Sequence, residues 1–239
     1  MDLTEIEALS FDCYGTLIDW EAGLAAVLTP WARDRGLDLA EENLLTGYAE
    51  AEAAVEAEQP TAAYPEILAE SLRRLGARLD GTVDARDTAR IAGSVPDWPA
   101  FPDSPDALAV LARHYQLIIL SNVDRNSFAA SQRRLGVTFT RVLTAEDIGS
   151  YKPSPRNFSA LQEAADTTGI GRGRLLHVTQ SLFHDHVPAK AAGLPTVWIN
   201  RRADRPGWGA TPAPPAPVTP DAEFRSLAAF AEAVETAHR

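Results

Sequence analysis

"LSFDCYGTLIDW", residues 9–20, decides the fold, because it runs an apolar strand into a single carboxylate, Asp12. The preceding residues 7–12, "EALSFD", have the short apolar run of a strand that is buried on both faces. A carboxylate held at the end of a rigid strand can attack an electrophilic carbon or phosphorus and form an ester. Tyr14 follows two residues later, and its identity bears on which leaving group such a carboxylate could displace.

The second half of the chain repeats this strand pattern in alternation with helical patterns. Four further apolar runs bounded by turn residues predict strands at 117–122, 141–146, 175–179 and 196–200. Helical patterns lie around them at 104–115, 126–136, 155–169 and 186–193. Alternating strands and helices predict an α/β fold, a Rossmann-like doubly wound parallel sheet covered by helices on both sides.

Residues 17–96 interrupt that alternation. They contain helix-like stretches at 21–35, 41–58, 65–78 and 84–93 and no convincing strand. The prediction is an inserted all-helical cap domain over the carboxyl ends of the strands, with the α/β core formed by residues 1–16 and 97–239. A Pro/Ala-rich loop at 205–220 and a terminal helix at 226–237 complete the predicted order.

Composition narrows the function classes. The 239 residues carry a formal net charge of -11, which argues against nucleic acid or an anionic membrane as a partner. Cys13 is the only cysteine, so no intramolecular disulfide can form and a reducing compartment fits. The acidic N-terminus lacks the features of a secretory signal, and no apolar run is long enough to span a membrane. We therefore expect a cytoplasmic protein that acts on a small molecule.

Polar residues cluster where the predicted strands end, and the loops at that edge of a parallel sheet converge on one crevice. They are Asp12, Ser121, Asn122, Lys152 and the segment from Gln180 to Asp185. A serine hydroxyl and nearby amides can bind substrate oxygens, and a lysine can hold a carboxylate ionised. Each residue alone could be an ordinary cap or turn residue, but their joint occurrence in this order favours one site.

The ordered motifs resemble those of the haloacid dehalogenase (HAD) superfamily. They are "FDCYGTL" (11–17), "LSNVD" (120–124), "YKPSP" (151–155) and "SLFHD" (181–185) followed by "AGLPTVWINRR" (192–202). The chain is most similar to the type II 2-haloacid dehalogenase-like branch. The resemblance implies catalytic Asp12, Lys152 and Asp185, with Asp12 as nucleophile, and substrate-binding Tyr14, Thr16, Ser121, Asn122, Gln180 and Ser181.

Two positions favour a dehalogenase over the phosphatases of the superfamily. Those phosphatases generally carry a second aspartate two residues after the nucleophile, where Tyr14 stands here. A phenol has a pKa of about 10 and is a poor acid at neutral pH, whereas a halide leaves without a proton. Gln180 stands where a phosphatase of similar spacing has a metal-binding aspartate. We therefore expect no metal and no required cofactor, and a (S)-2-haloacid dehalogenase-like hydrolase that forms an aspartyl ester.

Other features leave alternatives open. The segment 43–60 lacks the arginine that grips the substrate in 2-haloacid dehalogenases and is instead rich in glutamate. We interpret those glutamates as a solvated helix face, the alternative being a cationic or neutral substrate. Phe158 stands where a tyrosine is expected. A Mg²⁺-dependent small-molecule phosphatase and a non-catalytic binding protein remain alternative functions. Helical caps in this branch often contribute to dimers, so the resemblance also allows a homodimer.

Overall fold

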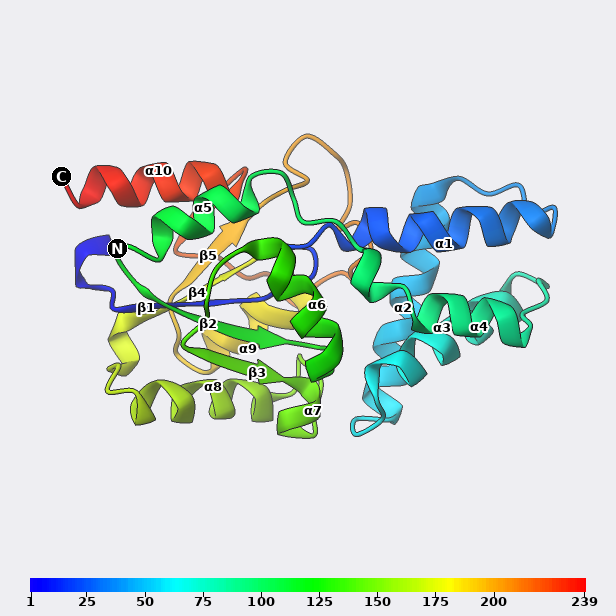
Figure 1. The fold of residues 1–239 in the computed structure, drawn as a ribbon, viewed down its shortest axis with the longest axis horizontal. Coiled ribbons are helices and arrows are strands. Elements are labelled where there is room, and N and C mark those ends of the chain that lie inside the picture. Colours follow the sequence, from blue (N-terminus) through cyan, green and yellow to red (C-terminus); the bar gives the residue numbers. More distant parts are fainter.

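The computed structural model describes the backbone of residues 1–239 and every side chain except that of Arg172. Its centre is a sheet of six parallel strands in the order β3-β2-β1-β4-β5-β6, which confirms the predicted fold class (Figure 1). The strands are β1 (Ala8–Phe11), β2 (Gln116–Ser121), β3 (Arg141–Thr144), β4 (Leu175–Thr179), β5 (Thr196–Ile199) and β6 (Ala222–Phe224). Because the chain builds outward from β1 in one direction and then returns to its other side, the order reverses between β1 and β4. Ligand crevices of open α/β sheets lie at such a reversal.

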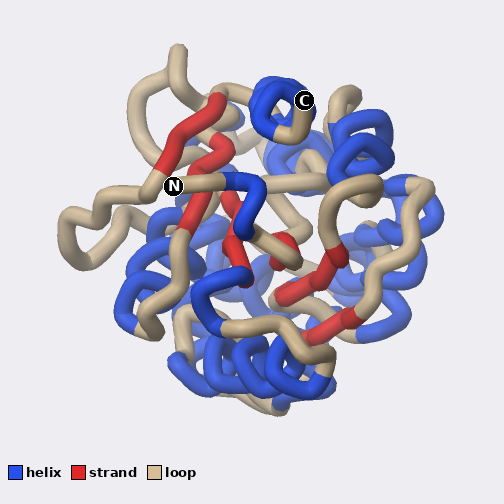
Figure 2. Tube along the Cα trace, turned by 90° about the vertical axis from the view of Figure 1, so that its left-hand side faces the viewer, coloured by secondary structure: helices blue, strands red, loops and turns tan.

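Helices cover both faces of this sheet, as Figure 2 shows in a view from the side of the strands' amino ends. They are α5 (Ser104–Leu111), α6 (Arg125–Leu135), α7 (Ala145–Ile148), α8 (Pro155–Thr167), α9 (Val187–Ala191) and α10 (Leu227–Ala237). Alternate strand residues serve opposite faces, since side chains in a strand have a period of two. Leu9 packs in one hydrophobic cluster with α5, α6 and α10, and Ala8 packs in a second with α8 and α9.

The register brings three strand ends together. Phe11 of β1 pairs with Ile119 of β2 on one side and with Val178 of β4 on the other. Asp12, the next residue after Phe11, therefore lies across the sheet from Leu120 of β2 and Thr179 of β4. The sheet register thus brings together the strand ends from which the loops and turns of the predicted site begin.

The first four helices after β1 form what we call the helical insert: α1 (Trp20–Asp34), α2 (Glu41–Glu58), α3 (Tyr64–Arg78) and α4 (Ala85–Ala92). Figure 1 shows them beyond the carboxyl ends of the strands. The two segments that connect the insert to the sheet lie side by side, because Asp19 N donates to Pro99 O and Phe101 N donates to Leu17 O. The four helices predicted within residues 17–96 agree with the observed ones within two residues at each end. The division into domains at residues 16 and 97 stays a prediction.

Several details differ from the sequence-based expectation. The helix predicted at 104–115 ends at Leu111, and the strand predicted at 141–146 ends at Thr144, where α7 begins. Strand β6 at the sheet edge was not predicted, because its three residues "AEF" form no apolar run. The helix predicted at 186–193 is shorter, α9, and is preceded by a π-helical turn over Leu182–His186. Such turns occur frequently at functional sites, and this one carries Asp185. None of the described helices combines the length and apolarity needed to cross a bilayer.

We expect Gly23→Ala to destabilise the contact between α1 and the returning segment. A Cβ at Gly23 would lie 2.3 Å from the ring of Trp98, which is buried and held by a hydrogen bond from Nε1 to Ser94 Oγ. Forcing the ring aside should lower the free energy of unfolding by about 1–3 kcal/mol, measured by urea denaturation. Gly171→Ala is the matched control, since nothing lies within 4 Å of its Cβ position. Equal stability of the two variants would contradict this packing.

Candidate active site

Asp12 leaves the end of β1 and is 6% exposed. The loop that follows turns back on itself, because Leu17 N and Ile18 N both donate to Cys13 O and Gly15 adopts a φ of 90° that favours glycine. This turn brings Thr16 back to the carboxylate, and its Oγ1 donates to Asp12 Oδ2 over 2.8 Å. One carboxylate oxygen is thus oriented by the same loop that carries it.

Lys152 orients the other oxygen. Its Nζ donates to Asp12 Oδ1 over 2.9 Å, to Asp185 Oδ1 over 2.7 Å and to Leu120 O over 3.0 Å. An ammonium has three donors, so all three are used, and the side chain is 1% exposed. Lys152 therefore links the ends of β1 and β2 to the π-helical turn that carries Asp185.

Asp185 is held in turn by a histidine from the sheet. His177 Nε2 lies 3.0 Å from Asp185 Oδ1, and His177 Nδ1 lies 2.9 Å from Ser10 Oγ. Because an ionised carboxylate only accepts hydrogen bonds, His177 Nε2 is the donor to Asp185. His177 and Ser10 are direct partners in the pairing of β1 with β4. The role of His177 in positioning Asp185 could be recognised only once this register was known.

Burial and charge set the protonation states of this cluster. Burial raises the pKa of Asp12, although Lys152 and the Thr16 hydrogen bond oppose the rise. Burial also disfavours the ionised form of Asp185, but the Lys152 ammonium and His177 outweigh it and hold the pKa of Asp185 well below its usual range. The charge of Lys152 is opposed by burial and favoured more strongly by the two carboxylates, so its pKa lies above its usual value. Asp12 is therefore the more basic of the two carboxylates.

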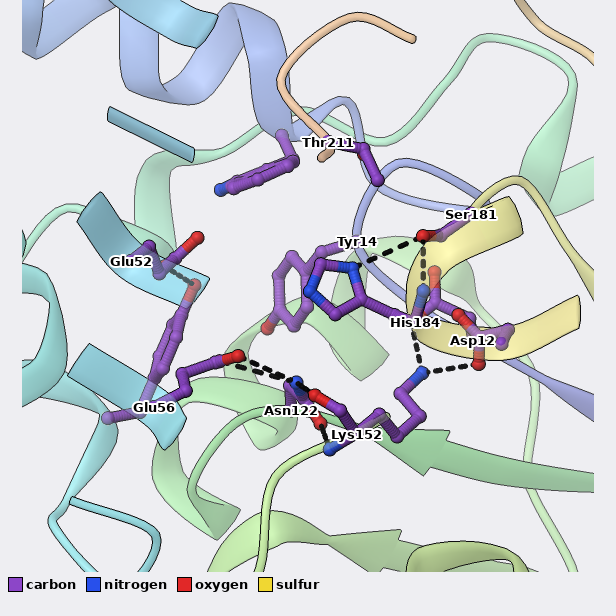
Figure 3. Close-up of a pocket in the computed structure, with 12 residues that line it drawn as sticks. Asp12, Tyr14, Glu52, Glu56, Asn122, Lys152, Ser181, His184 and Thr211 are labelled. Atoms are coloured by element: carbon purple, nitrogen blue, oxygen red, sulfur yellow. Dashed lines mark hydrogen bonds and ion pairs between the residues drawn. The ribbon is translucent and has the colours of Figure 1, made fainter. Parts of the chain in front are cut away.

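A small cavity of about 40 Å³ opens in front of Asp12 (Figure 3). The core side of this cavity includes Asp12, Lys152 and Asp185 together with Tyr14, Asn122 and Ser181. The helical insert contributes Trp20, Glu52, Glu56 and Tyr64. Most of the predicted site residues thus meet around one space, between the sheet and the insert.

Glu52 and Glu56 correct the interpretation of the glutamate-rich segment as a solvated face. Both are 6% exposed, lie one turn apart on α2 and point toward the core residues in Figure 3. Tyr64 OH donates to Glu52 Oε1 over 3.1 Å, and Asn122 Nδ2 donates to Glu56 Oε2 over 3.1 Å. Burial raises the pKa of Glu52 to about 8 and that of Glu56 well above its usual value. The signal missed was their spacing, which puts both on one face of the helix with buried Val55 between them in the sequence.

Three residues singled out from the sequence are placed away from the cavity. The side chain of Gln180 lines two neighbouring hollows, while its backbone N donates to Thr16 Oγ1 over 3.0 Å. Ser121 is buried at the end of β2, and its Oγ has no hydrogen-bond partner among the described residues. Phe158 packs edge-on to His177, with ring centroids 5.7 Å apart. Neither Gln180 nor Ser121 lines the cavity in front of Asp12, and their contacts with a substrate stay predictions.

Tyr14 and Asn122 are oriented by bonds within the core. Tyr14 OH lies 2.8 Å from Ser131 Oγ, and burial raises the pKa of Tyr14 well above its usual value. Asn122 Oδ1 accepts from Lys152 N over 2.7 Å, and its Nδ2 donates to Lys152 O over 3.0 Å. Tyr14 is thus a neutral wall of the cavity, and Asn122 fixes the backbone from which Lys152 projects.

The donor set does not fit a hard divalent cation. Among the described residues, no group of three or more His, Cys, Asp or Glu side chains is arranged to hold a metal ion. The Lys152 ammonium bonds to both Asp12 and Asp185, so the two carboxylates of the core that line the cavity already share a cation. We derive no chemical step through a metal.

A doubly wound parallel sheet with a buried Asp–Lys–Asp cluster at its carboxyl edge and a helical insert above it defines a class of α/β hydrolases. The chain belongs to the haloacid dehalogenase-like hydrolase family, whose model matches residues 6–193. No curated protein sequence is significantly similar to the chain.

Solved structures share the fold over nearly the whole chain. The L-2-haloacid dehalogenase PA0810 is 23% identical, with a TM-score of 0.72 over 97% of this chain and 99% of its own. The L-2-haloacid dehalogenase from Xanthobacter autotrophicus with chloropropionic acid covalently bound is 21% identical, with a TM-score of 0.73 over 96% and 98%. The HAD-hydrolase YfnB from Bacillus subtilis bound to magnesium is 18% identical, with a TM-score of 0.73 over 96% and 99%. At these identities the likeness shows a common fold.

Proposed function

We propose that the protein is a 2-haloacid dehalogenase-like hydrolase that cleaves a carbon–halogen bond through an ester on Asp12. An oxygen of the Asp12 carboxylate attacks the carbon, the carbon–halogen bond breaks, and halide leaves with the bonding electron pair. Water then adds to the carboxyl carbon of the ester, which releases the hydroxylated product and returns Asp12. The observation that carries this proposal is an oriented, buried carboxylate facing a cavity beside a neutral Tyr14.

Charge development explains the roles of the neighbours. During ester hydrolysis negative charge builds on the Asp12 carboxyl oxygen, and the Lys152 ammonium and Thr16 hydroxyl already bond to the two oxygens. Donors that are in place before the reaction need no reorganisation when the charge forms. Lys152 and Thr16 are therefore proposed to stabilise the tetrahedral intermediate of the second step.

The attacking water needs a proton acceptor, and His184 suits that role. It lines the same cavity, and its Nδ1 lies 3.2 Å from Ser181 Oγ. Burial lowers the pKa of His184 to about 4, so the imidazole is neutral near pH 7 and able to accept a proton. Asp185 is less suited, because its strongly depressed pKa makes it a weak base. The sequence placed His184 in the segment from Gln180 to Asp185 but gave it no role of its own.

Phosphate-ester hydrolysis is less well supported. It would need an acid to protonate the leaving alkoxide, and burial holds the pKa of Tyr14 far above neutrality. It would also need a cation that the donor set does not accommodate. A binding protein without activity would not need a carboxylate oriented at both oxygens.

The test compares halide release from chloroacetate and 2-chloroalkanoates with hydrolysis of p-nitrophenyl phosphate, each with chelator and with added Mg²⁺. We expect halide release from at least one 2-chloroalkanoate at a rate that chelator leaves unchanged, and background rates with the phosphate ester. Phosphatase activity that chelator removes and Mg²⁺ restores would replace this proposal with the alternative. Absence of both activities would favour a binding role.

A further inference from the structure

The charges around the cavity are unbalanced. Four carboxyl side chains line it (Asp12, Asp185, Glu52 and Glu56), but Lys152 is the only lysine or arginine among its described lining residues. His184 also lines the cavity and is neutral near pH 7 because burial lowers its pKa to about 4. The ammonium of Lys152 is already shared between Asp12 and Asp185. A ligand that enters from the side of the insert therefore meets more carboxyl groups, ionised or protonated, than positive charges.

Glu52 and Glu56 differ from three of the four exposed glutamates of the same helix. Glu42, Glu50 and Glu58 each form an ion pair with an arginine, namely Arg202, Arg78 and Arg74. No lysine, arginine or histidine among the described side chains forms an ion pair with Glu52 or Glu56. Burying an acid without a counter-charge is costly, so a helix keeps such a pair only where something else compensates it.

A purely structural role does not account for the pair. The bonds from Tyr64 and Asn122 require only an acceptor oxygen, which the carboxamide of glutamine supplies without a charge. Two carboxyls one helical turn apart, both facing the nucleophile, instead suit a ligand that brings its own positive charge.

A second, independent feature also points to a ligand. Trp20 lines the same cavity and is 8% exposed, and its Nε1 has no hydrogen-bond partner among the described residues. A buried indole N–H normally finds an acceptor. The rings of Trp20, Tyr14 and Tyr64 all line the cavity with the two glutamates, and aromatic faces attract cations.

We propose that Glu52 and Glu56 bind the ammonium group of an amine-bearing substrate, with an oxygen of the same ligand accepting from Trp20 Nε1. The substrate class is then a small halogenated amino acid, a zwitterion, rather than a simple 2-haloacid. This assignment of the substrate rests on the proposed attack of Asp12 on carbon. It also explains why the insert carries acids where simple 2-haloacid dehalogenases are expected to carry an arginine.

The pair gives ammonium binding a defined pH dependence. Burial raises the pKa of Glu52 to about 8, so raising the pH from 6.5 to 8.5 ionises a group that attracts the ligand. An aliphatic ammonium stays protonated over that range, since its pKa is about 10. Burial also raises the pKa of Asp12 and of Glu56, so any change of charge in these two groups over that range adds negative charge as well. Asp185 stays ionised, Lys152 and the phenols of Tyr14 and Tyr64 stay protonated, and His184 stays neutral.

Binding is measured by calorimetry with two isosteric probes that lack a leaving group, 4-aminobutanoate and pentanoate. They differ only in an ammonium against a methyl group. We expect the wild-type protein to bind 4-aminobutanoate at least about tenfold more tightly at pH 8.5, with a smaller preference at pH 6.5. Equal affinities, or tighter binding of pentanoate, would overturn the proposal, as would a preference that does not grow with pH.

Two variants and a control locate the effect. Glu52→Gln and Glu56→Gln keep the acceptor oxygens for Tyr64 and Asn122, and each should remove most of the preference for 4-aminobutanoate. Glu50→Gln, an identical change at an exposed position of α2, should leave the preference unchanged. If the two buried variants keep the wild-type preference, the pair does not hold the ammonium. The pH series on the wild-type protein decides the question even if a variant fails to fold.

Turnover separates this inference from the proposed function. 4-Amino-2-chlorobutanoate and 2-chloropentanoate present the same reacting carbon and again differ by ammonium against methyl. Faster halide release from the amino compound supports both proposals. Equal release from the two overturns the ammonium site and leaves the dehalogenase proposal standing. No release from either, with a clear preference for 4-aminobutanoate in binding, overturns the dehalogenase proposal alone.

Discussion

Asp12→Asn is expected to lower halide release by at least about 10³-fold, because an amide cannot serve as the carboxylate nucleophile. The change is isosteric, and Lys152 keeps its bond to Asp185, so the fold should survive. The measurement is the initial rate with a substrate that the wild-type protein turns over, together with circular dichroism to check folding. Asp106→Asn, an exposed position in α5, is the matched control and should keep the wild-type rate. A residual rate within tenfold of wild type would exclude Asp12 as the nucleophile.

The same step leaves an isotopic trace. With enzyme in excess over substrate in H₂¹⁸O, hydrolysis of the ester places one solvent oxygen in the Asp12 carboxyl group, while the product takes its new oxygen from the protein. Mass spectrometry of the peptide that contains Asp12 should detect the label. A label found only in the product would indicate direct attack by water.

Lys152→Met is expected to lower the free energy of unfolding by about 3–5 kcal/mol, because it leaves Asp12 and Asp185 buried without a counter-charge. It should also remove activity. The chain has only two lysines, and Lys190→Met is therefore the natural control. Lys190 pairs with Asp221 at the surface, where an ion pair contributes about 0–1 kcal/mol. Chemical denaturation measures the free energy of unfolding of both variants. The loss should be several-fold larger for Lys152→Met than for Lys190→Met.

The depressed pKa of Asp185 determines the direction in which the stability of the folded protein changes in acid. A carboxylate whose pKa is lower in the folded protein than in the unfolded chain stabilises the fold above its unfolded pKa of about 3.9 and loses that contribution as the pH falls below it. Stability of the wild-type protein should therefore fall between about pH 5 and pH 3. The double variant Lys152→Met/Asp185→Asn removes both members of the pair and should fall less over that interval. An equally steep fall in both proteins would contradict a shared origin in Lys152 and Asp185.

The sequence alone predicted the sheet and the residues that stand at its carboxyl edge. Periodicity identified β1 to β5 and the helices of the insert, since a buried strand and a helix leave different spacings of apolar residues. Asp12, Lys152 and Asp185 were recognisable because each sits in a short ordered motif. Strand β6 was missed, as three residues at a sheet edge carry too little pattern.

What the sequence by itself determined is therefore the fold and the Asp–Lys–Asp cluster, which depend on local patterns and on the order of the strands. Only the tertiary structure decided the rest of the cavity. His177 became the anchor of Asp185 through the register of β4 against β1, Gln180 turned out of the cavity, and Glu52 and Glu56 became buried by the packing of α2 over the sheet. Glutamates in a helix look alike in sequence whether they face water or a buried cluster of charged side chains. The difference lies in what packs against the helix, and that is set by residues distant in the chain.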